Sequence, residues 1–192
     1  MARTVKVSFS ERKFVSAEPR EFPLEDAEFE DCTFSKLPLN DTSLRRCRFF
    51  DCTFSDCDFT LSRVVDCAFV RVKFERCRLT GINWSEVDKL ERVSFAGSQL
   101  NDTTFIAAKL TACDFSKCVA RRASFRDLSL RGTSFRGAEL EGSEFVNADL
   151  READFREATG YQISPRENRL EKARFSLPEA TRLLDGLGIV LD

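Results

Sequence analysis

A large apolar residue, most often phenylalanine or leucine, recurs at every fifth position along most of this 192-residue chain. The series runs from Leu24 to Trp84, passes over one extra residue, and resumes from Leu90 to Phe155. A period of five fits neither the 3.6-residue period of an α-helix nor the two-residue period of a strand. A chain with this period must turn at short, regular intervals, so the sequence predicts a solenoid.

A smaller side chain lies two residues before each of these large residues. Ala27, Cys32, Cys113 and Ala153 are examples, and the other three positions of each unit are mostly polar or charged. Every unit therefore sends one large residue, here called the central residue, and one small residue toward the interior. This is the binary pattern of a thin tube whose interior is filled with side chains.

The unit itself resembles that of the pentapeptide-repeat proteins. Ala148-Asp149-Leu150-Arg151-Glu152 and Ala153-Asp154-Phe155-Arg156-Glu157 match the family's pattern of a small residue, Asp or Asn, then Leu or Phe. The resemblance covers residues 22–157. It implies an all-β fold, a right-handed quadrilateral β-helix with four units in each coil.

Like residues recur at a spacing of 20, which is what a four-unit coil requires. Phe34, Phe54 and Phe74 form one such column, and it continues through Phe95 and Phe115 once the extra residue is counted. These residues should stack at the ~4.8 Å spacing of neighbouring strands. The extra residue near Val87, in 85–92, is therefore expected to form a single-residue bulge that leaves the register unchanged.

The sequence divides into three parts around this repeat. Residues 1–21 are expected to form an N-terminal cap or an irregular first coil, because only Phe9 and Phe14 keep the phase. Residues 22–176 are the β-helix, with a break at 159–167, and residues 177–192 are a helix and tail. Ser176 and Glu179 have the spacing of a capping box, which predicts a short helix over 180–187.

All eight cysteines occupy the small inward position, which favours a structural role over a disulfide or metal site. Cys32 and Cys52, Cys47 and Cys67, and Cys57 and Cys77 should lie one above the other. Stacked Cα atoms about 4.8 Å apart are within disulfide range, but the side chains would point in parallel. We expect free thiols that act as small apolar groups, and no metal or cofactor.

The chain offers little for catalysis. It has no histidine, the usual general base near neutral pH, and no glycine-rich phosphate loop. Its carboxylates fall on the convex outer surface, so we expect a protein that is not an enzyme. No stretch approaches the roughly 20 apolar residues of a membrane span, and no signal segment follows Met1; a cytoplasmic location is expected.

The apolar tail predicts an interface. Leu183-Leu184-Asp185-Gly186-Leu187-Gly188-Ile189 is similar to the tail of the topoisomerase-protecting members of the family (the Qnr, MfpA, AlbG and McbG type), a similarity that implies a tail-to-tail homodimer. The alternative is that the tail only caps its own coil. The residues expected at the dimer interface are Leu177, Ala180, Leu183, Leu184, Leu187, Ile189 and Val190.

Charge is unevenly spread along the sequence, although the net charge is only −2. Residues 18–31 carry a net charge of −6, residues 63–78 carry +3, and residues 138–157 carry −5. A tail-to-tail dimer would bring two copies of the last block together. The acidic surface expected from this block comprises Glu139, Glu141, Glu144, Asp149, Glu152, Asp154 and Glu157.

The resemblance to the topoisomerase-protecting type implies a DNA mimic. Such a rod would bind DNA gyrase, through the DNA-binding saddle of its A subunit, or topoisomerase IV, and would protect it from a quinolone or a natural toxin. The result would be drug resistance or self-immunity. The alternative is a pentapeptide-repeat scaffold that binds another protein. Direct binding of nucleic acid is not expected, because the chain has no continuous basic stripe.

Overall fold

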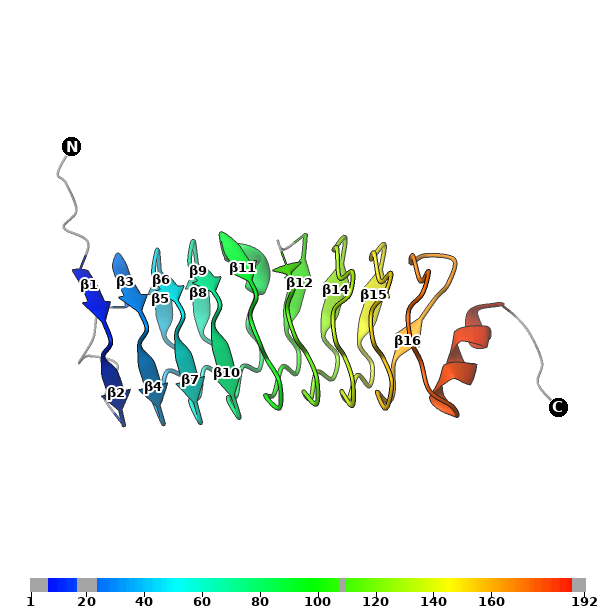
Figure 1. Cartoon of the computed structure of the whole chain (residues 1–192), viewed down its shortest axis with the longest axis horizontal. Helices are drawn as coiled ribbons and strands as arrows, with labels where there is room; N and C mark the ends of the chain where they lie inside the picture. The colour runs from blue at the N-terminus through cyan, green and yellow to red at the C-terminus, as the bar shows by residue number, and fades with distance from the viewer. Residues whose placement is uncertain (1–6, 17–23, 108–109, 188–192) are drawn as a thin grey trace.

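The computed structural model describes residues 7–16, 24–107 and 110–187, which form a rod of stacked coils (Figure 1). The strands are short because the chain turns after each unit. Every strand pair is parallel, and a residue usually lies opposite its equivalent in the next coil, as in Phe34↔Phe54. The right-handed, four-sided β-helix expected from the sequence is confirmed.

Three faces of the rod carry strands. One face holds β1 (Val7–Ser10), β3 (Ala27–Glu30), β6 (Arg48–Phe50), β9 (Ala68–Val70), β11 (Lys89–Glu91) and β13 (Leu110–Thr111), and the next holds β2 (Lys13–Val15), β4 (Thr33–Ser35), β7 (Thr53–Ser55) and β10 (Lys73–Glu75). A further face holds β5 (Ser43–Arg45) and β8 (Arg63–Val65), then β12 (Thr104–Ile106), β14 (Ser124–Arg126), β15 (Glu144–Val146) and β16 (Gln162–Ile163). The remaining face is joined by isolated parallel bridges, such as Val119↔Glu139.

The central residues fill the interior in vertical columns. The rings of Phe34 and Phe54 stack with centroids 4.4 Å apart, and those of Phe125 and Phe145 with centroids 4.8 Å apart. Rings of neighbouring columns meet edge to face, as Phe115 and Phe125 do at 90°. Both geometries are favourable for aromatic pairs. The rod therefore holds one continuous apolar core along its length.

The corners need left-handed backbone conformations. The second residue after a central residue has positive φ in coil after coil, for example Asp51 at 53° and Asn147 at 52°. Asp, Asn and Gly tolerate this region best, which explains why they recur at the corners. At Gly160 a side chain is also excluded by space, since a Cβ would lie 3.0 Å from the Cα of Glu141.

The extra residue near Val87 is absorbed where the chain turns between two faces. A single 3₁₀ turn, η2 (Trp84–Glu86), precedes it, and Leu90 of β11 then pairs with Phe69 of β9, one position later than the regular spacing would give. The rings of Phe74 and Phe95 still stack, 5.5 Å apart and inclined by 1°. The columns thus pass the insertion without interruption.

The break at 159–167 consists of two irregularities that compensate each other. Phe145 pairs with Ile163 and not with Pro165, the residue that the regular spacing would bring there, so this corner is shortened by two positions. The loop after Ile163 is longer by the same amount, and Asn168 returns to the regular spacing by accepting a hydrogen bond from the Ala148 amide. Tyr161 is fully buried and packs between Phe155 and Phe175.

The two ends of the rod differ (Figure 1). At the N-terminal end, β1 and β2 pair in register with β3 and β4, and Phe9 and Phe14 join the columns. At the C-terminal end, Phe175 stacks on Phe155 and the chain then enters η3 (Glu179–Leu187), which lies against β16. Among the described residues, no helix is long and apolar enough to cross a membrane.

The helix at the C-terminal end differs from its sequence prediction in two details. It is a 3₁₀ helix that begins at Glu179, and the expected capping box is wrong. The Ser176 hydroxyl accepts a hydrogen bond from the Glu157 amide of the coil below, and Glu179 pairs with Arg182. Ser176 is therefore used to close the last coil and not to begin the helix.

The eight cysteines are free and buried. Several thiols contact a backbone carbonyl of the preceding coil, as Cys77 Sγ does to the Phe54 oxygen at 3.3 Å. Serine takes the same position elsewhere, where Ser98 Oγ donates to the Phe74 oxygen at 2.9 Å. The small inward position thus suits a short side chain that can donate weakly to the coil below.

We expect eight free thiols when the denatured, unreduced protein is titrated with a thiol reagent, and almost none at pH 8 in the native protein. Burial shields the native thiols and raises the pKa of Cys52 and of Cys118 to about 12. Finding far fewer than eight thiols after denaturation would contradict the assignment of free cysteines.

Candidate partner-binding surface

The seven carboxylates of the expected acidic surface all point outward from the last coils before η3. Asp149 and Asp154 are half-buried, and the five glutamates are exposed. They come from several faces and corners, because consecutive units lie on consecutive sides of the rod. The structure therefore distributes the block around the rod instead of gathering it on one face.

Arginines of the preceding coil pair with four of these carboxylates. Arg121 lies 2.7 Å from Glu139, Arg131 lies 2.6 Å from Glu152, and Arg136 lies 2.5 Å from Glu157. Arg126 forms the fourth pair, with Glu144. In each pair the two partners are about one coil apart in the sequence, so these contacts join neighbouring coils.

Two further carboxylates pair with an arginine of their own five-residue unit. Arg151 Nε donates to Asp149 at 2.7 Å and Arg156 Nε donates to Asp154 at 2.9 Å. The side-chain hydrogen bond from the arginine holds the pKa of each aspartate below its usual value, against the opposing effect of burial. Both carboxylates are thus kept ionised by a partner two residues away.

This pairing corrects the charge picture obtained by counting along the sequence. Seven carboxylates meet six arginines, which leaves a net charge of −1 for the group. Of the seven carboxylates, only Glu141 forms no ion pair with another residue of 7–16, 24–107 and 110–187. The linear count of −5 omitted four arginines, because they precede residue 138 in sequence but lie beside the carboxylates in space. The coil length of 20 residues could have predicted these neighbours, because an outward residue lies beside the residue about 20 positions earlier.

Ion pairs between neighbouring coils also occur toward the N-terminal end. Arg46, Arg71, Arg76 and Arg122 each form a two-pronged pair with an aspartate 20 residues earlier, namely Asp26, Asp51, Asp56 and Asp102. Both partners lie at the left-handed corner position of successive coils. The hydrogen bond from the arginine lowers the pKa of each aspartate.

These pairs also neutralise the basic block at 63–78 and part of the first acidic block. Arg71, Arg76 and Arg78 are all paired with aspartates, the last with Asp58 at 2.7 Å. At the N-terminal end, Glu30 and Asp31 form no ion pair with another residue that the structure describes. Uncompensated negative charge is therefore found near the start of the rod as well as at Glu141.

The residues expected at a dimer interface lie in different environments. Leu177 is 79% exposed, Ala180 and Leu184 are half-buried, and Leu183 packs against the core. Leu187 is the last residue of η3, and its side chain is outside the description. Ile189 and Val190 lie outside the described residues.

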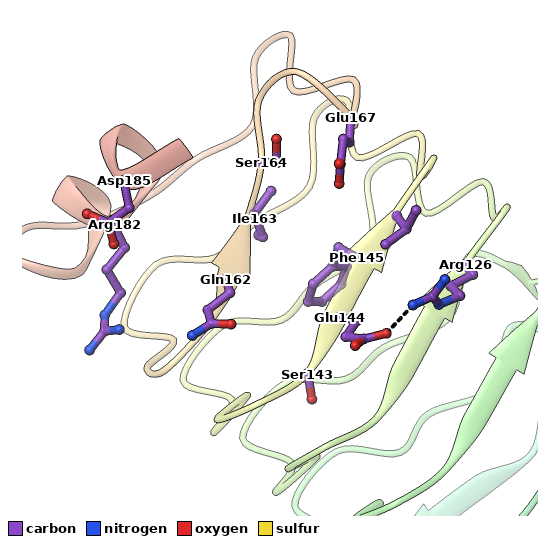
Figure 2. Close-up of a pocket in the computed structure, with 11 residues that line it drawn as sticks. Arg126, Ser143, Glu144, Phe145, Gln162, Ile163, Ser164, Glu167, Arg182 and Asp185 are labelled. Carbon is purple, nitrogen blue, oxygen red and sulfur yellow. Dashed lines mark hydrogen bonds and ion pairs between the residues drawn. The ribbon is translucent and has the colours of Figure 1, made fainter. Parts of the chain in front are cut away.

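A groove separates η3 from the face of the rod that carries β14, β15 and β16 (Figure 2). Its volume is about 360 Å³, and its apolar lining includes Phe145, Val146 and Ile163. The polar lining comes from three elements: Arg126 and Glu144 on the strands, Glu167 on the loop after β16, and Arg182 and Asp185 on η3. Across the described stretches, no three potential ligand side chains are grouped to hold a metal ion.

Comparison with known proteins agrees with this architecture. A family described as a pentapeptide repeat region matches residues 27–105 and 89–175. Trypsin-treated QnrB1, a plasmid-mediated fluoroquinolone resistance protein, is 15% identical, with a TM-score of 0.53 over 97% of this chain and 98% of its own. HetL, involved in heterocyst differentiation in the cyanobacterium Nostoc sp. strain PCC 7120, is 17% identical, with a TM-score of 0.51 over 88% of this chain and 83% of its own. No curated protein sequence matches.

The arginine–aspartate pairs should make stability depend on pH below about 4, the ordinary range of the aspartate pKa. Because the folded pKa of Asp51 and of Asp102 is lowered, their contribution is present above the ordinary aspartate pKa and is lost as pH falls through the folded value. We expect the variant Asp51→Asn/Asp102→Asn to melt below the wild type at pH 7, with a gap that closes by about pH 2.

Asp41→Asn is the matched control, because the Asp41 carboxylate lies at a corner, accepts a hydrogen bond from Asn40, and forms no ion pair with another described residue. Its melting temperature should follow that of the wild type at every pH. A gap for the double variant that stays constant from pH 7 to pH 2 would show that the ion pairs do not contribute to folding.

Proposed function

The chain belongs to the pentapeptide-repeat family, and we propose that it is a cytoplasmic protein-binding rod that protects DNA gyrase or topoisomerase IV from a poison. In this proposal the rod occupies the saddle in which the enzyme holds DNA, and it acts by binding without a catalytic step. Protection of the enzyme would confer drug resistance or self-immunity. The rod acts as a homodimer joined through Leu177 and η3.

The length of the rod is the observation that carries this proposal. The likeness to QnrB1, itself a fluoroquinolone resistance protein, runs along nearly the whole of both chains. Coils spaced by ~4.8 Å give a rod of about 35 Å, and two rods joined end to end reach roughly 70 Å. That length corresponds to about two turns of B-DNA.

The ion pairs define how such a rod could engage a basic saddle. Each paired carboxylate keeps part of its hydrogen-bonding capacity, because a carboxylate has about four acceptor sites and its arginine occupies one or two. Basic side chains of the enzyme would therefore share these carboxylates with the rod's own arginines. Glu141 offers a carboxylate free of any such partner among the described residues. Recognition would thus rest on geometry more than on a large net charge.

A second candidate is a scaffold that binds a different protein. It is favoured by the net charge of only −1 that the seven carboxylates and their six paired arginines carry together, which is less negative than a DNA mimic would ordinarily need. HetL, with the same fold and a comparable TM-score, belongs to a regulatory process. The gyrase experiment below separates the two candidates, since a scaffold for another protein would leave gyrase unaffected.

In a gyrase supercoiling assay with a quinolone present, excess wild-type protein should restore activity. The variant Glu139→Gln/Glu141→Gln/Glu152→Gln should need about tenfold more protein for the same protection, because three negative charges of the acidic surface are lost. Glu11→Gln/Glu30→Gln/Asp31→Asn carries the same change of charge at the far end of the rod and should protect like the wild type. Equal loss in both variants, or no protection by the wild type, would refute the proposed target surface.

Light scattering at micromolar concentration should give about 44 kDa, twice the chain mass of 21.9 kDa. Leu177→Asp/Leu184→Asp should give monomers that keep the circular dichroism of the β-helix, because neither side chain is fully buried. Leu61→Asp is the control, since Leu61 is 59% exposed on the side of the rod. A monomeric wild type would refute the dimer and leave the gyrase assay to decide the function.

A further inference from the structure

The groove between η3 and the last strands has the size and lining of a small-molecule site. Its volume of about 360 Å³ lies within the range of roughly 300–1,000 Å³ that is usual for ligand pockets. Phe145, Val146 and Ile163 supply an apolar floor, and polar side chains surround it from the strands, the loop after β16 and η3 (Figure 2). An apolar floor with a few convergent polar groups is typical of a site for a small ligand.

Helix η3 closes the end of the sheet beside this groove. Tyr161 is fully buried, Ile163 is only 4% exposed, and η3 packs against β16. The backbone of β16 is therefore covered, and a ligand of the groove must be recognised by side chains. A slender, flexible molecule suits such a site better than a segment of polypeptide.

Two carboxylates of the groove have no basic partner. Asp185 on η3 and Glu167 on the loop after β16 lie on opposite sides of Ile163 (Figure 2). Both are exposed, and neither forms an ion pair with another residue that the structure describes. The apolar floor is thus flanked by a carboxylate on each side.

The two arginines that line the groove do not compensate these carboxylates. Arg126 forms its ion pair with Glu144, and Arg182 lies 2.5 Å from Glu179. The charge of Glu167 raises the pKa of Arg126, but less than the hydrogen bond to Glu144 does. The groove therefore keeps uncompensated negative charge at both sides of its floor.

We propose that the groove binds an aliphatic diamine or polyamine. One ammonium group pairs with Asp185 and the other with Glu167, while the methylene chain between them lies over Val146 and Ile163. An ammonium group has three donors and no acceptor, which suits a carboxylate, and the methylene groups gain from being removed from water. A monoamine or an uncharged chain satisfies only part of this site.

This site goes beyond the proposed topoisomerase-binding function and does not depend on it. Val146, Glu167 and Asp185 belong neither to the seven carboxylates of the acidic surface nor to the residues expected at the dimer interface. Binding of a diamine is measured with this chain alone, so a failure to protect gyrase would leave the result unaffected.

The test is an NMR titration of the full chain with 1,6-diaminohexane at low salt. The methyl signals of Val146 and Ile163 should shift to saturation and show NOEs to the methylene groups of the ligand. Hexylamine should bind about threefold more weakly, because it leaves one carboxylate unpaired, and 1,6-hexanediol should not bind. Glu167→Gln/Asp185→Asn should weaken diamine binding about tenfold, the effect expected for two exposed ion pairs.

Glu11→Gln/Glu171→Gln is the matched control, because both glutamates are exposed, lie outside the groove and form no ion pair with another described residue. It should bind the diamine like the wild type. Equal weakening in both double variants would overturn the proposal, since it would show only a general attraction of cations to the rod. Equal affinity for hexylamine and the diamine, or binding that leaves the methyl signals of Val146 and Ile163 unchanged, would overturn it as well.

A second copy of this chain is the other occupant that the titration can detect. Shifts of the Val146 and Ile163 methyl signals that rise with protein concentration, without any diamine, would assign the groove to that second copy. This outcome would also overturn the proposal.

Discussion

Parallel stacking of one coil on the next is the constraint on which the rest of the structure depends. Each unit is too short to bury its own central residue, and the residue becomes buried only when the coils above and below supply its walls. The aromatic columns, the carbonyl contacts of the thiols and the cross-coil ion pairs all follow from the same four-unit repeat. Departures from that repeat, at Val87 and at 159–167, are tolerated because each restores the columns within one coil.

The interior could be predicted almost completely from sequence, because burial imposes the same choice at every fifth residue. Phe54, Phe115 and Phe135 are in the columns to which the spacing assigns them. The region around Tyr161 could not be predicted. The corner there is two residues shorter and the following loop two residues longer, so the spacing of the repeat before and after the region is unchanged and reveals neither. Only the structure shows that Tyr161 packs against Phe155 and Phe175 where the regular pattern fails.

The surface was harder to predict, for a different reason. A count of charge along the chain groups sequence neighbours, but the nearest neighbours of an outward residue lie one coil away, as Arg131 and Glu152 show. A solenoid thus separates sequence proximity from electrostatic proximity. The coil length, applied to the outward positions as well as to the core, would have revealed the arginines and corrected the expected charge. The role of the tail could not be predicted in the same way, because the residues expected at an interface would acquire a role only in the presence of a partner.

The central claim is that arginines of one coil cover the carboxylates of the next, so that the surface near the C-terminal end is paired and nearly neutral. The most direct measurement is an NMR titration of the Glu152 carboxyl in the wild type and in Arg131→Ala. The hydrogen bond from Arg131 holds the pKa of Glu152 below its usual value, so the account predicts a lowered pKa in the wild type that returns toward about 4.3 in the variant. An identical Glu152 pKa in both proteins would show that the coils are not joined in this way.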